Sequence, residues 1–188
     1  FARSFVRNRI ASLEKDVNHC LQSPYAPFPA MLYCFSTIDL LGALYSGQAG
    51  KNTFTSNNSK KYMQEFMNYT SEQASFLTEI FRHKLVHLAQ PRAIILDGDG
   101  SRVSWQYFHD NSEKHLLVEK TEPVLKIQIK SDWEITINKI FNVGILQLIH
   151  DIKDSVEKHN GYLDKLENSD LVRDNFEKAL AEIYSSII

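Results

Sequence analysis

Hydrophobic residues near the start of the chain recur at intervals of three and four positions, which is the spacing of one face of a helix. The first stripe predicts a helix that ends before Pro24, and it consists of Val6, Ile10, Leu13, Val17 and Leu21. A second helix is expected from about Ala30 to Ser46, where Gly47 ends it. Because its side chains are apolar nearly all round, we expect it to lie at the centre of a helical bundle.

A polar linker and two further helices are predicted next. Gln48 to Ser59 is rich in Gly, Asn, Ser and Thr, and it predicts a loop. A third helix is expected around three aromatic residues, Tyr62, Phe66 and Tyr69. Thr70 and Gln73 have the spacing of a capping box, so a fourth helix is expected to begin there and to run to Gln90, before Pro91.

After residue 91 the apolar period changes from the helical value to two, which is typical of strands. Residues 94–96 and the alternating Val103, Trp105 and Tyr107 flank a turn at 97–100, and together they predict a hairpin. Further strands are expected at 116–118 and along the alternation Leu125, Ile127 and Ile129. Residues 92–137 are therefore predicted to form a small antiparallel sheet.

Helical spacing returns in the last part of the chain. One long helix is expected along Ile140, Gly144, Leu148, Ile152 and Val156, with Asn160 and Gly161 ending it in a Schellman motif. A final helix follows along Val172, Phe176, Leu180, Ile183 and Ile187. The pattern predicts a mostly α, α+β protein. It is expected to be a single domain over 1–188, with a helical bundle at 1–91 and 138–188 and a β insertion at 92–137.

Composition and charge narrow the class of partner. A net charge of -2 excludes the overall basic field that is typical of nonspecific nucleic-acid binders, so a nucleic-acid site would need a local positive patch. Cys20 and Cys34 lack metal-type spacing and are expected to be reduced, buried thiols. The apolar run 28–45 contains Pro29 and Asp39, so we interpret it as a core helix and expect no membrane contact and a cytoplasmic location.

The segment Arg82 to His87 carries the chain's most reactive combination of side chains. An arginine holds and neutralises a phosphate, while a histidine takes up or releases a proton near neutral pH. His83 stands directly after the arginine. The pattern favours phosphodiester cleavage. Its alternative is structural, with Arg82 as an ion-pair partner and the histidines as surface residues.

Metal sites are not expected. Asp97 to Gly100 resembles the start of a calcium loop, but Phe108 stands where the loop needs a bidentate glutamate, so a turn is the better interpretation. His83 and His87 have the i, i+4 spacing of zinc ligands, but no glutamate of the metalloprotease type follows His83. No cofactor-binding glycine loop is present in the sequence.

At Arg82 to His87 the sequence resembles the HEPN superfamily, whose signature is an arginine, four to six intervening residues and a histidine. The very apolar second helix with its lone acidic Asp39 and the mostly helical chain resemble that family as well. A second match, Arg102 to His109, lies in a predicted strand.

The resemblance implies an antiparallel helical bundle that forms a homodimer and cleaves RNA without a metal at the dimer cleft. Arg82 would then hold the scissile phosphate, His87 would transfer the proton of the attacking ribose hydroxyl, and His83 would orient or bind the substrate. The alternative is a noncatalytic HEPN-like module for nucleotide or RNA binding, or for dimerisation. The sheet at 92–137 is not part of the resemblance.

Asp39 is the one formal charge between Phe28 and Gly50. Burial of an unpaired carboxylate is costly, so a buried Asp39 is expected to pair with a cation, and Arg82 is the leading candidate. The alternative is that Asp39 faces solvent.

Overall fold

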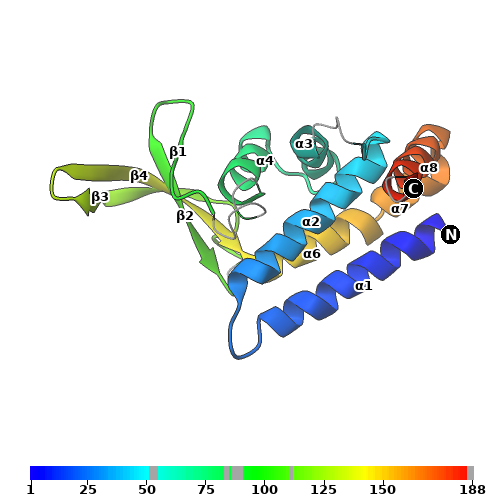
Figure 1. The fold of residues 1–188 in the computed structure, drawn as a ribbon, viewed down its shortest axis with the longest axis horizontal. Helices are drawn as coiled ribbons and strands as arrows, with labels where there is room; N and C mark the ends of the chain where they lie inside the picture. The colour runs from blue at the N-terminus through cyan, green and yellow to red at the C-terminus, as the bar shows by residue number, and fades with distance from the viewer. Residues whose placement is uncertain (51–54, 83–84, 86–90, 111, 186–188) are drawn as a thin grey trace.

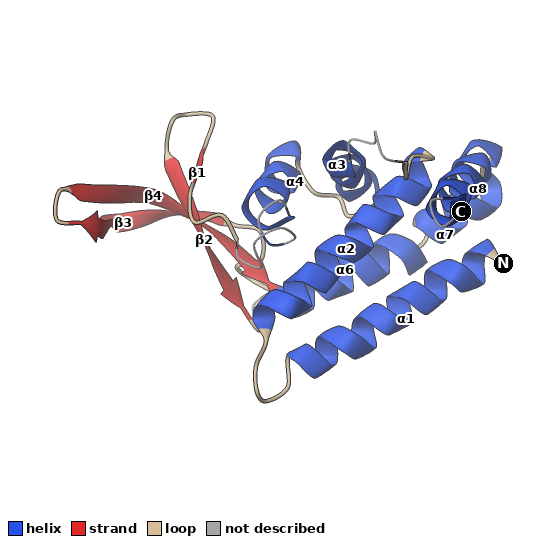
Figure 2. Ribbon diagram, viewed as in Figure 1, coloured by secondary structure: helices blue, strands red, loops and turns tan. Residues whose placement is uncertain are grey.

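The computed structural model describes residues 1–50, 55–82, 85, 91–110 and 112–185. It is an α+β structure, 58% helical, with a four-stranded mixed sheet. Figures 1 and 2 show the helices packed together on one side and the strands projecting from them on the other. The predicted α+β, mostly helical class is confirmed.

The first two helices form the base of the core. α1 (Ala2–Cys20) buries Val6, Ile10, Leu13 and Val17, which confirms the predicted stripe. α2 (Pro27–Ser46) packs against α1 and ends at Gly47, whose φ of 67° is left-handed. Of the described helices, α2 alone is long and apolar enough to cross a membrane, and 56% of that stretch is buried inside the molecule. The core interpretation of α2 agrees with this burial.

The predicted loop at Gln48 to Ser59 is wrong at its end, because α3 (Thr55–Phe66) already begins at Thr55. Two polar residues of α3, Asn58 and Ser59, are buried against α2. The close approach depends on Gly42, since a Cβ at that position would lie 2.8 Å from the backbone carbonyl carbon of Asn58. A glycine on the facing helix thus makes room for a segment whose composition resembles a loop.

The capping box is confirmed. The Thr70 hydroxyl accepts from the Gln73 N–H at 3.1 Å, and the Gln73 side chain accepts from the Thr70 N–H at 2.9 Å. α4 (Ser71–Phe76) follows it and continues into a π-helical segment, η1 (Leu77–Arg82). The predicted end of this helix at Gln90 lies outside the described residues.

The sheet has the order β1-β2-β4-β3. β1 (Ile95–Leu96) and β2 (Arg102–Phe108) form the predicted antiparallel hairpin, and β3 (Val118–Lys130) pairs antiparallel with β4 (Trp133–Gly144). The prediction of a wholly antiparallel sheet is wrong, because β2 and β4 pair in parallel from Val103↔Lys139 to Phe108↔Gly144. β4 inserts between β2 and β3, so two strands that are not consecutive in the sequence become neighbours.

The predicted start of the long helix at Ile140 is also wrong. β4 runs through Ile140 to Gly144, and α6 begins only at Ile145 (Ile145–Glu157). All four residues from Phe141 to Gly144 are buried at the end of this strand. Ile140 and Gly144, the first two residues of the predicted helical stripe, thus belong to the strand. The strands therefore occupy residues up to 144, beyond the expected limit of 137.

A short helix and a longer one complete the described part of the chain. α7 (Tyr162–Asn168) was not predicted, and α8 (Asp170–Ser185) was. Gly161 does not end α6 in a Schellman motif, because α6 ends at Glu157 and Gly161 is the N-cap of α7. A Cβ on Gly161 would lie 2.7 Å from the Lys158 carbonyl oxygen, so glycine is needed for the close turn. Cys20 and Cys34 are both free thiols, and burial raises the pKa of the Cys34 thiol to about 12.

Candidate active site around Arg82

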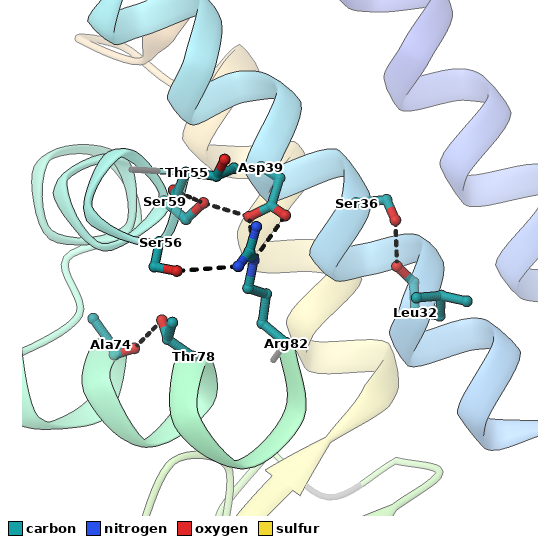
Figure 3. A network of polar contacts seen from close by, with 9 residues as sticks. All are labelled: Leu32, Ser36, Asp39, Thr55, Ser56, Ser59, Ala74, Thr78 and Arg82. Carbon is teal, nitrogen blue, oxygen red and sulfur yellow. Dashed lines mark hydrogen bonds and ion pairs between the residues drawn. The ribbon is translucent and has the colours of Figure 1, made fainter. Parts of the chain in front are cut away.

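Arg82 lies at the end of η1 and faces Asp39 of α2 (Figure 3). Its Nε donates to Oδ2 of Asp39 at 2.9 Å and to Oδ1 at 3.3 Å. The two side chains are only 16% and 18% exposed, so the pair is mostly shielded from water. The predicted coupling of Asp39 to Arg82 is confirmed, and the solvent-facing alternative for Asp39 is wrong.

Two serines of α3 complete the network, and the sequence interpretation missed both. Ser59 donates to Oδ1 of Asp39 at 2.5 Å or to the Thr55 carbonyl at 2.9 Å, and Arg82 donates from Nη1 to Ser56 Oγ at 3.0 Å. The spacing of the serines, three residues apart, places them on one face of a helix. That signal is visible in the sequence only if a helix is assigned from Thr55 onward.

The guanidinium keeps donors for a ligand. Arginine has five N–H donors in a planar fork. Asp39 occupies the Nε donor, and Ser56 occupies one on Nη1. Within the described part of the chain, no hydrogen-bond partner contacts Nη2. Among the described residues, Nη2 and the second Nη1 hydrogen thus have no acceptor, while Asp39 and Ser56 hold the fork in one orientation.

The two motif histidines, His83 and His87, lie outside the described residues. Leu85, between them, is described and is buried in a helical turn. Of the motif, Leu85 thus belongs to the hydrophobic core, and Arg82 pairs with Asp39 of α2.

No cluster of three or more metal-ligating side chains occurs among the described residues. The predicted turn at Asp97 to Gly100 is confirmed by the Gly100 N–H, which donates to the Asp97 carbonyl at 2.9 Å. Lys139 Nζ contacts the carboxylates of Asp97 and Asp99 at 2.5 and 2.8 Å, and these hydrogen bonds raise the lysine pKa to about 12. A lysine therefore occupies the position where a calcium loop would place its cation.

A second polar cluster, which the sequence interpretation missed, lies where α6 meets the sheet. Asp151 accepts from the Tyr69 hydroxyl at 2.6 Å and from Gln147 at 3.0 Å, and it lies 3.2 Å from His115 Nε2. The Gly144 N–H donates to His115 Nδ1 at 3.0 Å, so Nε2 carries the imidazole hydrogen and donates it to Asp151. Both imidazole nitrogens are engaged, so this cluster is a structural tie between α6, Tyr69 and the segment before β3.

Comparison of the chain with protein-family models, with curated proteins and with solved structures finds no match.

Proposed function

We propose that this protein is a HEPN-like, metal-independent endoribonuclease that acts through Arg82 and His87 at a homodimer cleft in the cytoplasm. The observation that supports this proposal best is the fixed guanidinium of Arg82. Its Nε donates to Asp39 and its Nη1 to Ser56, and Nη2 has no hydrogen-bond partner within the described part of the chain. A permanent cation in a mostly shielded position is suited to binding a phosphate and stabilising the charge that develops on it.

The proposed reaction needs one proton acceptor and one phosphate-binding cation. His87 accepts the proton of the ribose 2′-hydroxyl, whose oxygen attacks the adjacent phosphorus while the bond to the 5′ oxygen breaks. The protonated His87 then gives this proton to the leaving 5′ oxygen, and the product strand ends in a 2′,3′-cyclic phosphate. Arg82 neutralises the negative charge on the nonbridging oxygens, and His83 orients the substrate. No metal ion is needed for this balance of protons and charges.

The proposed substrate is single-stranded RNA. Because the net charge is -2, the positive potential must be concentrated near Arg82 instead of spread over the surface. A short unpaired segment suits such a local site better than a long duplex, whose binding would need many distributed phosphate contacts.

His87→Ala is the decisive variant, with cleavage of single-stranded RNA as the measurement. We expect a loss of at least about a hundredfold, which is the usual contribution of a general base, and no effect of EDTA on the wild type. His109→Ala is the matched control, because His109 belongs to the other Arg-to-His match and lies directly after β2, where its loss should leave cleavage unchanged. Arg82→Lys keeps the charge and loses the fork, so it should retain Asp39 pairing but cleave poorly.

Loss of activity in EDTA would contradict the metal-free mechanism. A wild-type protein that binds RNA but cleaves none of a varied set of substrates would favour the noncatalytic binding module. A histidine variant with unchanged cleavage would remove His87 from the site.

A further inference from the structure

The far ends of β3 and β4 project from the body as a two-stranded arm, residues 122–136 (Figure 1). Leu125, Ile127 and Trp133 on this arm are 44–53% exposed. The register Leu125↔Ile137 and Ile127↔Ile135 puts the aliphatic residues of both strands on one face. Ile137, at the base of this face, is buried in the molecule, whereas Leu125, Ile127 and Trp133 remain in water, so a partner that covers the outer part of the face would stabilise it.

A groove of about 610 Å³ lies between the arm and β1. Trp133 and Ile135 line it from the arm, and Ile95 and Leu96 line it from β1. Four charged residues also line the groove, and they balance in sign: Glu79, Arg92, Arg102 and Glu134. A neutral rim with both signs suits an identical surface, whose glutamates can meet the arginines, better than a polyanion.

The two edges of the arm differ. The outer strand, β3, carries Pro123, Lys126 and Lys130, which are the residues that protect an edge from further pairing. β4 carries none of these between Trp133 and Ile137. β2 pairs with β4 only from Lys139 onward, so in the described part of the chain this stretch of β4 has no strand on the side away from β3.

We infer that the groove is the docking surface for a second copy of this chain, with β4 pairing antiparallel to its own symmetry mate around Ile135. In this register Trp133 lies opposite Ile137 and Glu134 opposite Thr136, so apolar residues meet and no like charges do. The inference rests on the homodimer of the proposed function and names its contact. Glu79, which lines the groove, is one turn before Arg82 on η1, so the docked copy lies beside the motif helix.

A charge exchange across the symmetry axis tests this contact, with mass measured by light scattering at tens of micromolar. The wild type should have twice the chain mass. Ile135→Glu and Ile135→Lys should each have the mass of one chain, because like charges then meet at the axis. A 1:1 mixture of the two variants should regain the doubled mass. Val124→Glu and Val124→Lys are matched controls, since Val124 is 44% exposed on the arm and does not line the groove.

A dimeric Ile135→Glu would place the dimer contact elsewhere and overturn the inference, as would a mixture that stays monomeric or a monomeric wild type. RNA cleavage measured on the same samples separates this failure from that of the proposed function. A monomer that cleaves RNA would contradict the dimer, both in this inference and in the proposed function, and would leave cleavage by Arg82 and His87 standing. If the wild type is a dimer, the two Ile135 variants behave as expected and no RNA is cleaved, the nuclease proposal is contradicted. The inference about the docking surface would still hold.

Discussion

At the scale of single residues, the pair Asp39 and Arg82 is the central feature of the molecule. A carboxylate in an otherwise apolar helix is costly to bury without a cation, and the nearby π-helical segment supplies one. Ser56 and Ser59 add hydrogen bonds to both charges. The pair therefore serves two purposes, since it neutralises a buried charge and orients the guanidinium.

Removal of one partner should destabilise the protein more than removal of an exposed pair. We expect Asp39→Ala to lower the free energy of unfolding by more than the ~1 kcal/mol of a surface ion pair and by less than the about 3–5 kcal/mol of a fully buried one. Urea denaturation measures it. A double-mutant cycle with Arg82→Ala should show a favourable coupling.

The interhelical pair Lys153–Glu14, with side chains 39% and 35% exposed, is the control for this cycle. Its coupling should be near zero to ~1 kcal/mol. An Asp39–Arg82 coupling no larger than that of the control would contradict the structural role of the pair.

At the scale of elements, the contact between α2 and α3 decides whether the site forms. α3 carries both serines, and it approaches α2 where Gly42 removes a side chain. The capping box then begins α4 only a few residues after α3 ends, so α4 and η1 lead Arg82 back to α2. Gly42 and the capping box at Thr70 and Gln73 thus help to place α2, α3 and η1 around the ion pair.

Gly42→Ala should destabilise the protein, although alanine favours helices. The added Cβ would lie 2.8 Å from the Asn58 backbone, and overpacking of this kind costs about 1–3 kcal/mol. That exceeds the about 1 kcal/mol that alanine gains over glycine in a helix. Thermal and urea midpoints measure the change. Gly98→Ala is the control because its Cβ would meet no atom within 4 Å, and an unchanged Gly42→Ala stability would contradict the tight contact.

At the scale of the whole molecule, the helices share one hydrophobic core with the inner parts of the sheet, and the arm projects beyond it. The core cluster includes Val103, Phe141 and Val143 from the strands together with residues of the helices. The polar tie of Tyr69, His115 and Asp151 joins the same parts, since Tyr69 precedes α4, His115 precedes β3, and Asp151 lies on α6.

This tie predicts a loss of stability in acid. Burial raises the pKa of Asp151, but hydrogen bonds from His115, Tyr69 and Gln147 outweigh it and lower the pKa below its ordinary value. A carboxyl with a lowered folded-state pKa stabilises above its unfolded pKa of about 3.9, and this stability is lost as the pH falls through the folded value. Urea midpoints from pH 7 down to pH 3 measure the effect.

In Asp151→Asn the urea midpoint should fall less between pH 7 and pH 3 than it does in the wild type, because asparagine does not titrate. Asp154→Asn, at an exposed position on the same helix, should leave it as in the wild type. If the urea midpoint fell equally with pH in the wild type and in Asp151→Asn, the stabilising role of the Asp151 carboxylate would be contradicted.

Local signals in the sequence predicted three helices, which the structure has at 2–20, 27–46 and 170–185. They also predicted the capping box, the hairpin at 95–108 and the need for a cation near Asp39. These features depend on nearest neighbours, on side-chain periodicity, and on the cost of a buried charge, all of which act within one segment. Arg82 was the leading candidate for the partner because it lies on the adjacent helix that carries the Arg-to-His motif.

Contacts between distant segments decided the rest. β4 at 133–144 carries apolar residues at spacings that fit a strand and a helix equally, and only its position between β2 and β3 selects the strand. The polar start of α3 is helical because Gly42 admits its backbone and Asp39 and Gln48 accept hydrogen bonds from Ser59 and Asn58. Ser56 reaches Arg82 for the same reason, and the Asp151 tie joins residues from three separate segments. The sequence by itself thus determined which charge had to be neutralised, and the tertiary structure decided which side chains hold the guanidinium, because those partners meet only when the segments pack.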